Sequence, residues 1–154
     1  MNSAKEIIEK LGLMAHPEGG WFVETYRSEA RVKGEGQGRA ASTSIYFLLE
    51  EGQRSAFHRI DSDEMWHHYQ GAAIRITLLE EDGPRVIDVG PLTDGLLPQA
   101  WVPAGVWFGA ELLGEGAYSL VGCTVAPGFE FSSFEMAERD ALIEHWPDHR
   151  ELIE

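Results

Sequence analysis

The residues best suited to chemistry lie between Gly52 and Gly71, in the stretch GQRSAFHRIDSDEMWHHYQG. This stretch is typical of two short strands joined by a tight polar turn, with His58 on the first strand and Glu64 on the second. We expect the two side chains to meet across the ladder between the strands. A carboxylate beside an imidazole fixes the tautomer of the ring and raises its basicity, as a proton-transfer site requires. The alternative is a buried histidine whose ring is hydrogen-bonded by a glutamate and which has no catalytic role.

Strand alternation selects the neighbours of Glu64, because successive side chains point to opposite faces of a sheet. If Glu64 points to the interior, Trp66 and His68 share its face. His67 and Tyr69 then point the other way, unless a bulge shifts the register. We therefore expect Trp66 to contact a ligand and regard His68 as a further ligand-binding candidate.

The spacing of these residues resembles the first signature motif of the cupin superfamily, in which a Gly, a His-x-His pair, a Glu and a second Gly follow at set intervals. Gly52, His58, Glu64 and Gly71 fall in register with that motif. Ile60 holds the place of the second His.

The second cupin motif has a Pro-x-Gly centre followed by a His. Residues 103–105 (Pro-Ala-Gly) match its centre, its leading Gly is displaced to Gly95, and Phe108 stands where the His belongs. Four stretches together look like one uncharacterised single-domain cupin family related to the dTDP-4-dehydrorhamnose 3,5-epimerases, namely HPEGGWFVETYRS (16–28), DEMWHHYQG (63–71), WVPAGVW (101–107) and VAPGFEFSSFEMA (125–137). The resemblance implies an all-β, cupin-type double-stranded β-helix, or jelly-roll barrel, with His58 and Glu64 facing its interior.

The usual cupin metal site is incomplete in this sequence. A catalytic zinc needs three protein ligands and an open position. His58 and Glu64 supply two, and His68 would be a third if its ring reached across. Ile60 and Phe108 replace the other usual ligands and make the cavity more apolar, which places Phe108 among the ligand-contacting candidates. We therefore expect no bound metal and no other cofactor.

The segment RSAFHR, residues 54–59, looks like the epimerase segment that places an Arg near the catalytic His. On that resemblance His58 is the base that removes a proton next to a carbonyl, and Arg54 holds an anionic group. The epimerases support their His with an Asp, a role that Glu64 would take here, and they use a Tyr as the acid. Three strand tyrosines are candidates for that acid and otherwise pack the core: Tyr26, Tyr46 and Tyr118.

The elements around these residues are mostly short strands separated by glycine turns, which indicates a sandwich or barrel of the jelly-roll kind. Ser3 and Glu6 form a capping box for a helix over residues 4–11. Residues 29–41 form a charged, glycine-rich loop, and Ser132 with Glu135 can cap a helix in the tail. We expect one cupin domain over residues 1–154, with the barrel at about 19–131 and a helical tail at about 134–154.

Composition limits the partners of the chain. Lys and Arg total 12 against 26 Asp and Glu, a net charge of −14, which repels nucleic acid and anionic membrane surfaces. The lone Cys123 fits a reducing cytosol, and no apolar run approaches the ~18 residues of a membrane helix, so we expect a cytoplasmic protein. An unpaired strand over residues 21–27 would favour association, and we expect a homodimer.

Three functions fit these observations. The first is a metal-independent isomerase or epimerase that acts on a sugar-like or carbonyl substrate. The second is a cupin that binds a small metabolite without converting it. The third is a metal-dependent cupin enzyme with an atypical ligand set.

Overall fold

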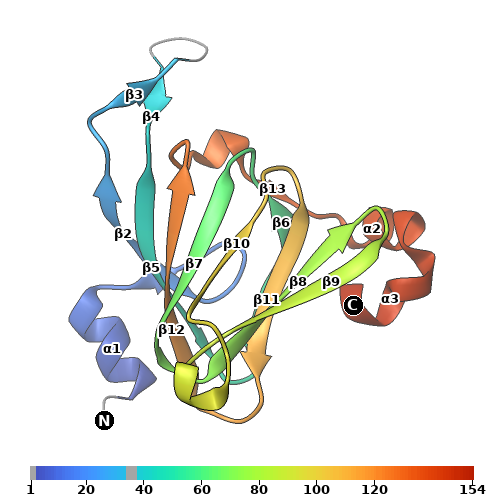
Figure 1. The fold of residues 1–154 in the computed structure, drawn as a ribbon, viewed down its shortest axis with the longest axis horizontal. Coiled ribbons are helices and arrows are strands. Elements are labelled where there is room, and N and C mark those ends of the chain that lie inside the picture. The colour runs from blue at the N-terminus through green and yellow to red at the C-terminus, as the bar shows by residue number, and fades with distance from the viewer. Residues whose placement is uncertain (1–2, 34–37) are drawn as a thin grey trace.

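Two antiparallel sheets face each other in the computed structural model of the protein, which describes residues 3–33 and 38–154 (Figure 1). The larger sheet has six strands, in the spatial order β1 (Met14–Ala15), β2 (Trp21–Arg27), β5 (Thr43–Glu50), β12 (Tyr118–Ala126), β7 (Asp63–Gly71) and β10 (Gln99–Val102). The smaller sheet has five, in the order β13 (Glu135–Met136), β6 (Arg54–Arg59), β11 (Trp107–Leu113), β8 (Ala73–Glu80) and β9 (Gly83–Val89). The all-β jelly-roll fold with short helices at both ends is therefore confirmed.

The remaining elements are short. A two-stranded hairpin projects beyond the larger sheet and consists of β3 (Arg31–Val32) and β4 (Arg39–Ala40) (Figure 1). The α-helices are α1 (Ala4–Leu11), α2 (Arg139–His145) and α3 (Arg150–Ile153). Three 3-10 turns are η1 (Leu92–Asp94), η2 (Phe131–Ser133) and η3 (Pro147–His149). Among the described residues, no helix is long and apolar enough to cross a membrane.

The core lies between the two sheets, where alternate strand residues meet. Its largest fully buried side chains include Phe47, Trp66, Ile76, Leu78 and Phe108. Two smaller clusters lie on the outer faces of the sheets. Helix α1 covers Leu48 and Leu120 of the larger sheet, and α2 with α3 covers Phe57 and Leu79 of the smaller one.

The N-terminal helix begins and ends as its sequence predicts. The Ser3 hydroxyl accepts a hydrogen bond from the Glu6 amide at 3.2 Å, and Gly12 ends the helix with a φ of 70°. Such a positive φ favours glycine because it has no Cβ.

The tail and the loop at 29–41 differ from the expectation. The predicted cap at Ser132 and Glu135 is not a helix start: Ser132 lies in η2, Glu135 pairs with Arg59 in the sheet, and α2 begins at Arg139. Phe129 and Phe134 of this segment are half-buried and line the cavity between the sheets, and this packing outweighs the local capping pattern. Part of the expected loop at 29–41 is the β3–β4 hairpin, and residues 34–37 of that loop lie outside the described residues.

The strands that carry His58 and Glu64 are not a hairpin. Strand β6 pairs with β11 and β13, whereas β7 pairs with β10 and β12, so the turn between them crosses from one sheet to the other. Strand β2 is also less exposed than expected, because β1 pairs with its residues Trp21 and Phe22.

Candidate functional site

A small cavity of about 30 Å³ lies between the two sheets near one end of the barrel. This volume accommodates about one water molecule. Its apolar lining comes mainly from Phe22, Ile45, Ile60, Val125 and Phe134. Its polar lining consists of His16, Glu18, Thr43, His58 and Glu64. The cavity thus brings two imidazoles and two carboxyl groups together in an otherwise apolar interior.

His58 is buried, and both of its ring nitrogens face acceptors. Nδ1 lies 2.7 Å from the carbonyl oxygen of Ala56, and Nε2 lies 2.8 Å from Oε2 of Glu18. Burial alone would lower the pKa of His58, but the charge and hydrogen bond of Glu18, aided by the charge of Glu64, raise it above its usual value. The raised pKa and the two flanking acceptors favour an imidazolium that donates from both nitrogens.

Glu18 reaches His58 from the turn His16–Gly20, which precedes β2. The carbonyl of Glu18 accepts a hydrogen bond from the Ala56 amide at 2.7 Å, so the turn is fastened to β6. A Cβ on Gly19 would lie 2.1 Å from the carbonyl oxygen of Arg54, and therefore only glycine permits this close approach. Burial would raise the pKa of Glu18, but the attraction and hydrogen bond of His58 outweigh it and lower that pKa.

Glu64 is the second carboxyl group of the cavity, and it lies on the opposite sheet. Its Oε2 accepts a hydrogen bond from Nε1 of Trp66 at 3.1 Å. No basic side chain of the described residues forms an ion pair with it. Burial, and then the charge of Glu18, raise the pKa of Glu64 to about 7, against the opposing effects of His58 and Trp66. Glu64 therefore changes its protonation state near neutral pH.

His16 completes the polar group. Its Nδ1 accepts a hydrogen bond from the Glu18 amide at 3.1 Å, so this nitrogen carries no proton. Burial, followed by the charge of His58, lowers the pKa of His16 against the effect of Glu18. We conclude that His16 is neutral and that its role in the cavity is to orient Glu18.

Aromatic rings cover the cavity. Phe134 lies with its ring centroid 5.3 Å from that of His58 and 5.9 Å from that of His16. Phe129 and Phe131 pack beside it, with centroids 4.9 Å apart. These phenylalanines come from the segment after β12, which leads across the barrel mouth to β13.

The family model described as Cupin superfamily (DUF985) matches residues 5–137, which include every residue of this cavity. The chain belongs to this cupin family. This agrees with the two sequence motifs and with the jelly-roll fold.

Relatives of this cupin cover nearly its whole length. A hypothetical protein from Leishmania major has 35% sequence identity and a TM-score of 0.91, with 99% of this chain and 97% of that chain covered. Protein SO0799 from Shewanella oneidensis has 38% identity and a TM-score of 0.89, with 99% and 96% covered. The uncharacterized protein YML079W of Saccharomyces cerevisiae is 29% identical over 161 residues, which cover 94% of this chain and 80% of that protein. Oxalate decarboxylase of Bacillus subtilis shares the fold alone, at 17% identity and a TM-score of 0.57 over 90% of this chain and 36% of that chain.

The residues of this cavity do not fit the metal site of other cupins. Ile60 lines the cavity at the position of one usual His, and Phe108 packs its ring 4.2 Å from His58 at the position of another. The Nε2 atom of His58, which would have to bind a metal, is paired with Oε2 of Glu18. In the described part of the chain, no group of three His, Cys, Asp or Glu side chains is placed to hold a metal ion.

Of the residues predicted from the sequence, His58 and Glu64 line the cavity of this cupin, but they do not pair. The carboxylate that bonds His58 is Glu18, because β6 and β7 lie in opposite sheets. Trp66 shares the inward face of Glu64, as strand alternation predicts, and donates to it from the core. Phe108 packs under His58.

Three other predicted residues lie away from the cavity. Arg54 is exposed and donates to the carbonyls of Leu152 and Glu154, which fastens the C-terminal helix. The Nε2 of His68 lies 3.0 Å from the carbonyl oxygen of Ala72. Tyr46 lies on the outer face of the larger sheet, with its ring centroid 6.0 Å from that of Tyr69.

Glu18 and His16 were not predicted as site residues. Their segment, HPEGG, has the composition of a surface turn. The sequence feature that could have pointed to these two residues is the pair Gly19-Gly20. Consecutive glycines permit a close approach between backbone segments, which can bring a neighbouring side chain into the interior.

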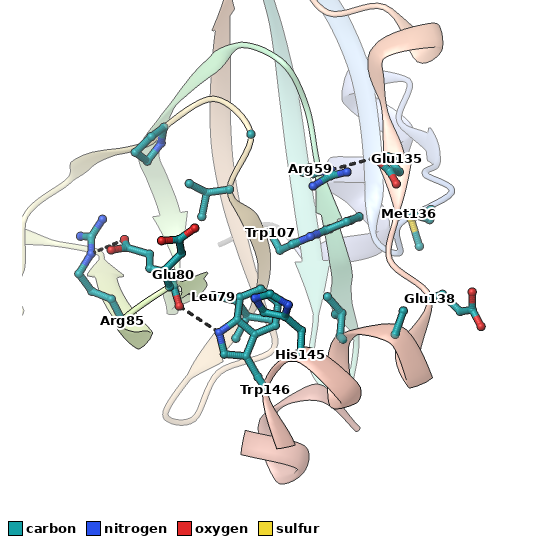
Figure 2. Close-up of a pocket in the computed structure, with 16 residues that line it drawn as sticks. Arg59, Leu79, Glu80, Arg85, Trp107, Glu135, Met136, Glu138, His145 and Trp146 are labelled. Carbon is teal, nitrogen blue, oxygen red and sulfur yellow. Dashed lines mark hydrogen bonds and ion pairs between the residues drawn. The ribbon is translucent and has the colours of Figure 1, made fainter. Parts of the chain in front are cut away.

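A larger groove of about 910 Å³ lies outside the barrel, between the smaller sheet and α2 (Figure 2). The guanidinium of Arg59 lies 4.2 Å over the ring of Trp107 and pairs with Glu135 at 2.8 Å. Nε1 of Trp146 donates to the carbonyl of Glu80 at 3.0 Å, which joins α2 to the β8–β9 hairpin. The charges of this groove are exposed and largely paired, and we therefore place the candidate chemistry in the barrel.

Proposed function

We propose that the barrel interior binds a small, uncharged metabolite and exchanges a proton with it, as a metal-independent isomerase or epimerase of a carbonyl or sugar-like compound does. The observation that supports this is Glu64, a buried carboxyl group whose hydrogen-bond partner is the Trp66 N–H, beside the His58–Glu18 ion pair. The reaction class is the one expected from the sequence, but the base is Glu64 in place of His58.

In this proposal Glu64 is the base. Both nitrogens of His58 donate to acceptors, so His58 has no lone pair with which to take a proton. A base works best when its pKa lies near the working pH, and the pKa of Glu64 is raised to about 7. Glu64 removes a proton from the carbon next to the carbonyl, and the electron pair moves to the carbonyl oxygen. The positive charge of His58 stabilises this enolate oxygen. A proton returned to the same carbon on its other face gives the epimer. A proton returned to the former carbonyl carbon, with the proton of the neighbouring hydroxyl moving to the enolate oxygen, gives the isomer.

The lining of the cavity limits the substrate. It contains no Arg or Lys, and the charge of His58 is already paired with Glu18, so an anionic group would enter without a free cation to pair with it. A sugar nucleotide is therefore a poor fit, and a neutral hydroxyketone or keto sugar is a better one. Because the cavity holds about one water, a larger ligand requires Phe134 and its neighbours to move.

The test is proton exchange in heavy water. Wild-type protein is incubated with neutral keto sugars and hydroxyketones, and NMR follows deuterium incorporation next to the carbonyl. We expect exchange that falls at least 100-fold in Glu64→Gln and is unchanged in Glu135→Gln, a matched control outside the barrel. Binding without exchange, for ligands that perturb the cavity resonances, would contradict the catalytic role and favour a cupin that binds without converting its ligand.

We also propose that the protein acts in the cytoplasm and that two copies associate, as its sequence predicts. The free thiol of Cys123 is buried beside the cavity, and burial raises its pKa well above the usual value, so it is protected against oxidation. Fractionation of the cells that make the protein tests its location.

A further inference from the structure

The groove outside the barrel, which we call the outer groove, has the size and the lining of a binding site for a small molecule (Figure 2). The β8–β9 hairpin, the turn between β10 and β11, strand β13 and helix α2 surround it. Its apolar lining includes Leu79, Val106, Trp107, Leu142 and Trp146. Its volume of about 910 Å³ lies in the range of small-molecule pockets, and the surrounding elements suit a compact ligand better than a long peptide.

Both arginines that line the outer groove are already paired. Arg85 pairs with Glu80 at 2.8 Å, and Arg59 pairs with Glu135 at the same distance. The lining contains no lysine. An anionic ligand would therefore have to displace a carboxylate of the protein before it could pair with an arginine.

Two carboxylates of the outer groove remain unpaired. Glu81 lies in the β8–β9 turn, and Glu138 directly precedes α2, where its side chain makes no capping bond to the helix. Both are exposed, and neither forms an ion pair with a basic side chain of residues 3–33 and 38–154. Four glutamates against two arginines give the lining a net charge of −2 with His145 neutral. The groove thus favours a cation, as does the whole chain with its net charge of −14.

The outer groove already holds one cation of the chain itself. The guanidinium of Arg59 lies 4.2 Å over the ring of Trp107 and pairs with the Glu135 carboxylate (Figure 2). Aromatic faces attract cations because the ring carries partial negative charge above its plane. This contact is independent of the two unpaired glutamates, and it shows that the groove surface accommodates a cation between an indole and a carboxylate.

We propose that the outer groove binds a linear aliphatic diamine, the chemistry of the polyamines. One ammonium group pairs with Glu81 and the other with Glu138, while the methylene chain covers the apolar lining between them. An inorganic cation would leave this apolar lining uncovered, and a monoamine would leave one carboxylate unpaired. The site lies outside the barrel and does not depend on the chemistry proposed there.

A bound diamine would join the β8–β9 hairpin to α2. One contact already links them, the hydrogen bond from Nε1 of Trp146 to the carbonyl of Glu80. Leu142 of α2 packs in the same cluster as Phe57, which precedes His58 on β6. The ligand would therefore stabilise the packing of the tail on the smaller sheet and raise the urea concentration at which the protein unfolds.

The test is NMR of protein labelled with ¹⁵N in its tryptophan side chains and titrated at pH 8 with 1,4-, 1,6- and 1,8-diaminoalkanes. We expect the indole N–H signals of Trp107 and Trp146 to shift, and that of the core residue Trp66 to stay in place. The best diamine should bind with a Kd below ~1 mM at low ionic strength and more weakly in added salt. Glu81→Gln and Glu138→Gln should each weaken its binding about 3–10-fold, because each removes one ion pair.

Glu9→Gln is the matched control, since Glu9 is an exposed carboxylate on α1, which packs on the other sheet, and it should leave the affinity unchanged. Hexylamine has one charge and should bind about 10-fold more weakly than the best diamine. Sedimentation velocity checks that the diamines do not aggregate the protein, and circular dichroism checks that each variant is folded.

Three results would overturn the site. The first is the absence of indole shifts at about 10 mM diamine. The second is binding that Glu9→Gln weakens as much as Glu81→Gln does, or that hexylamine matches, because it would reflect general attraction to an acidic surface. The third is a Lys-Ala-Lys-Ala peptide that binds the same residues at least ten times more tightly than any diamine, which would assign the outer groove to a basic protein segment.

Discussion

Replacing Glu64 by Gln should make folding stability less dependent on pH. The folded protein holds the pKa of Glu64 at about 7, against a usual value of 4.5. The folded state therefore prefers the protonated group, and this stabilisation is fully present below pH 4.5. It is lost as the pH rises through 7, because the unfolded chain ionises first. At 1.36 kcal/mol per pKa unit, the linkage relation gives a loss of about 2.5 kcal/mol between pH 5 and pH 8.

The assay is urea unfolding of wild type and Glu64→Gln at both pH values. Gln cannot ionise, but its carbonyl can still accept the hydrogen bond of Trp66. All other titrating groups are common to the two proteins, so the change in their stability difference from pH 5 to pH 8 isolates Glu64. We expect this change to favour Gln by about 2.5 kcal/mol. A change near zero would show that the carboxyl group has an ordinary pKa, which refutes the reasoning that makes Glu64 the base.

Three other substitutions test the surroundings of Glu64. Glu18→Gln should cost about 3–5 kcal/mol in urea unfolding near neutral pH, because it leaves the buried His58 charge without its partner, and a cost below about 1 kcal/mol would contradict the ion pair. Phe134→Ala should open the cavity and speed the alkylation of Cys123 by iodoacetamide several-fold, whereas an unchanged rate would show that this ring does not control access. Trp146→Phe removes the hydrogen bond to Glu80 and should cost about 1 kcal/mol while heavy-water exchange is unaffected, and reduced exchange would instead implicate the outer groove.

Much of the fold was predictable because it depends on local patterns. Alternating residues place Trp66 and Glu64 on one face of β7, and the Ser3 cap and Gly12 stop define α1. The tail was less predictable, since the packing of Phe134 against His58 is a long-range contact, and α2 begins only at Arg139.

The site was predictable only in part. His58 and Glu64 both line the cavity, as expected, but which carboxylate bonds His58 depends on which sheet each strand joins. Local sequence patterns predict the strands β6 and β7 and the turn between them. They do not reveal that this turn crosses from one sheet to the other. Glu18 is forty residues before His58 in the chain, and its approach depends on the close contact of Gly19 with β6.

The protonation states of His58 and Glu64 test the central claim most directly. NMR of protein labelled with ¹⁵N-histidine and ¹³C-glutamate measures both between pH 6 and pH 8. We predict that His58 carries protons on both nitrogens at pH 7 and that the carboxyl carbon of Glu64 titrates near pH 7. A neutral His58 at pH 7, with Glu64 already ionised at pH 6, would contradict the account and return the role of base to His58.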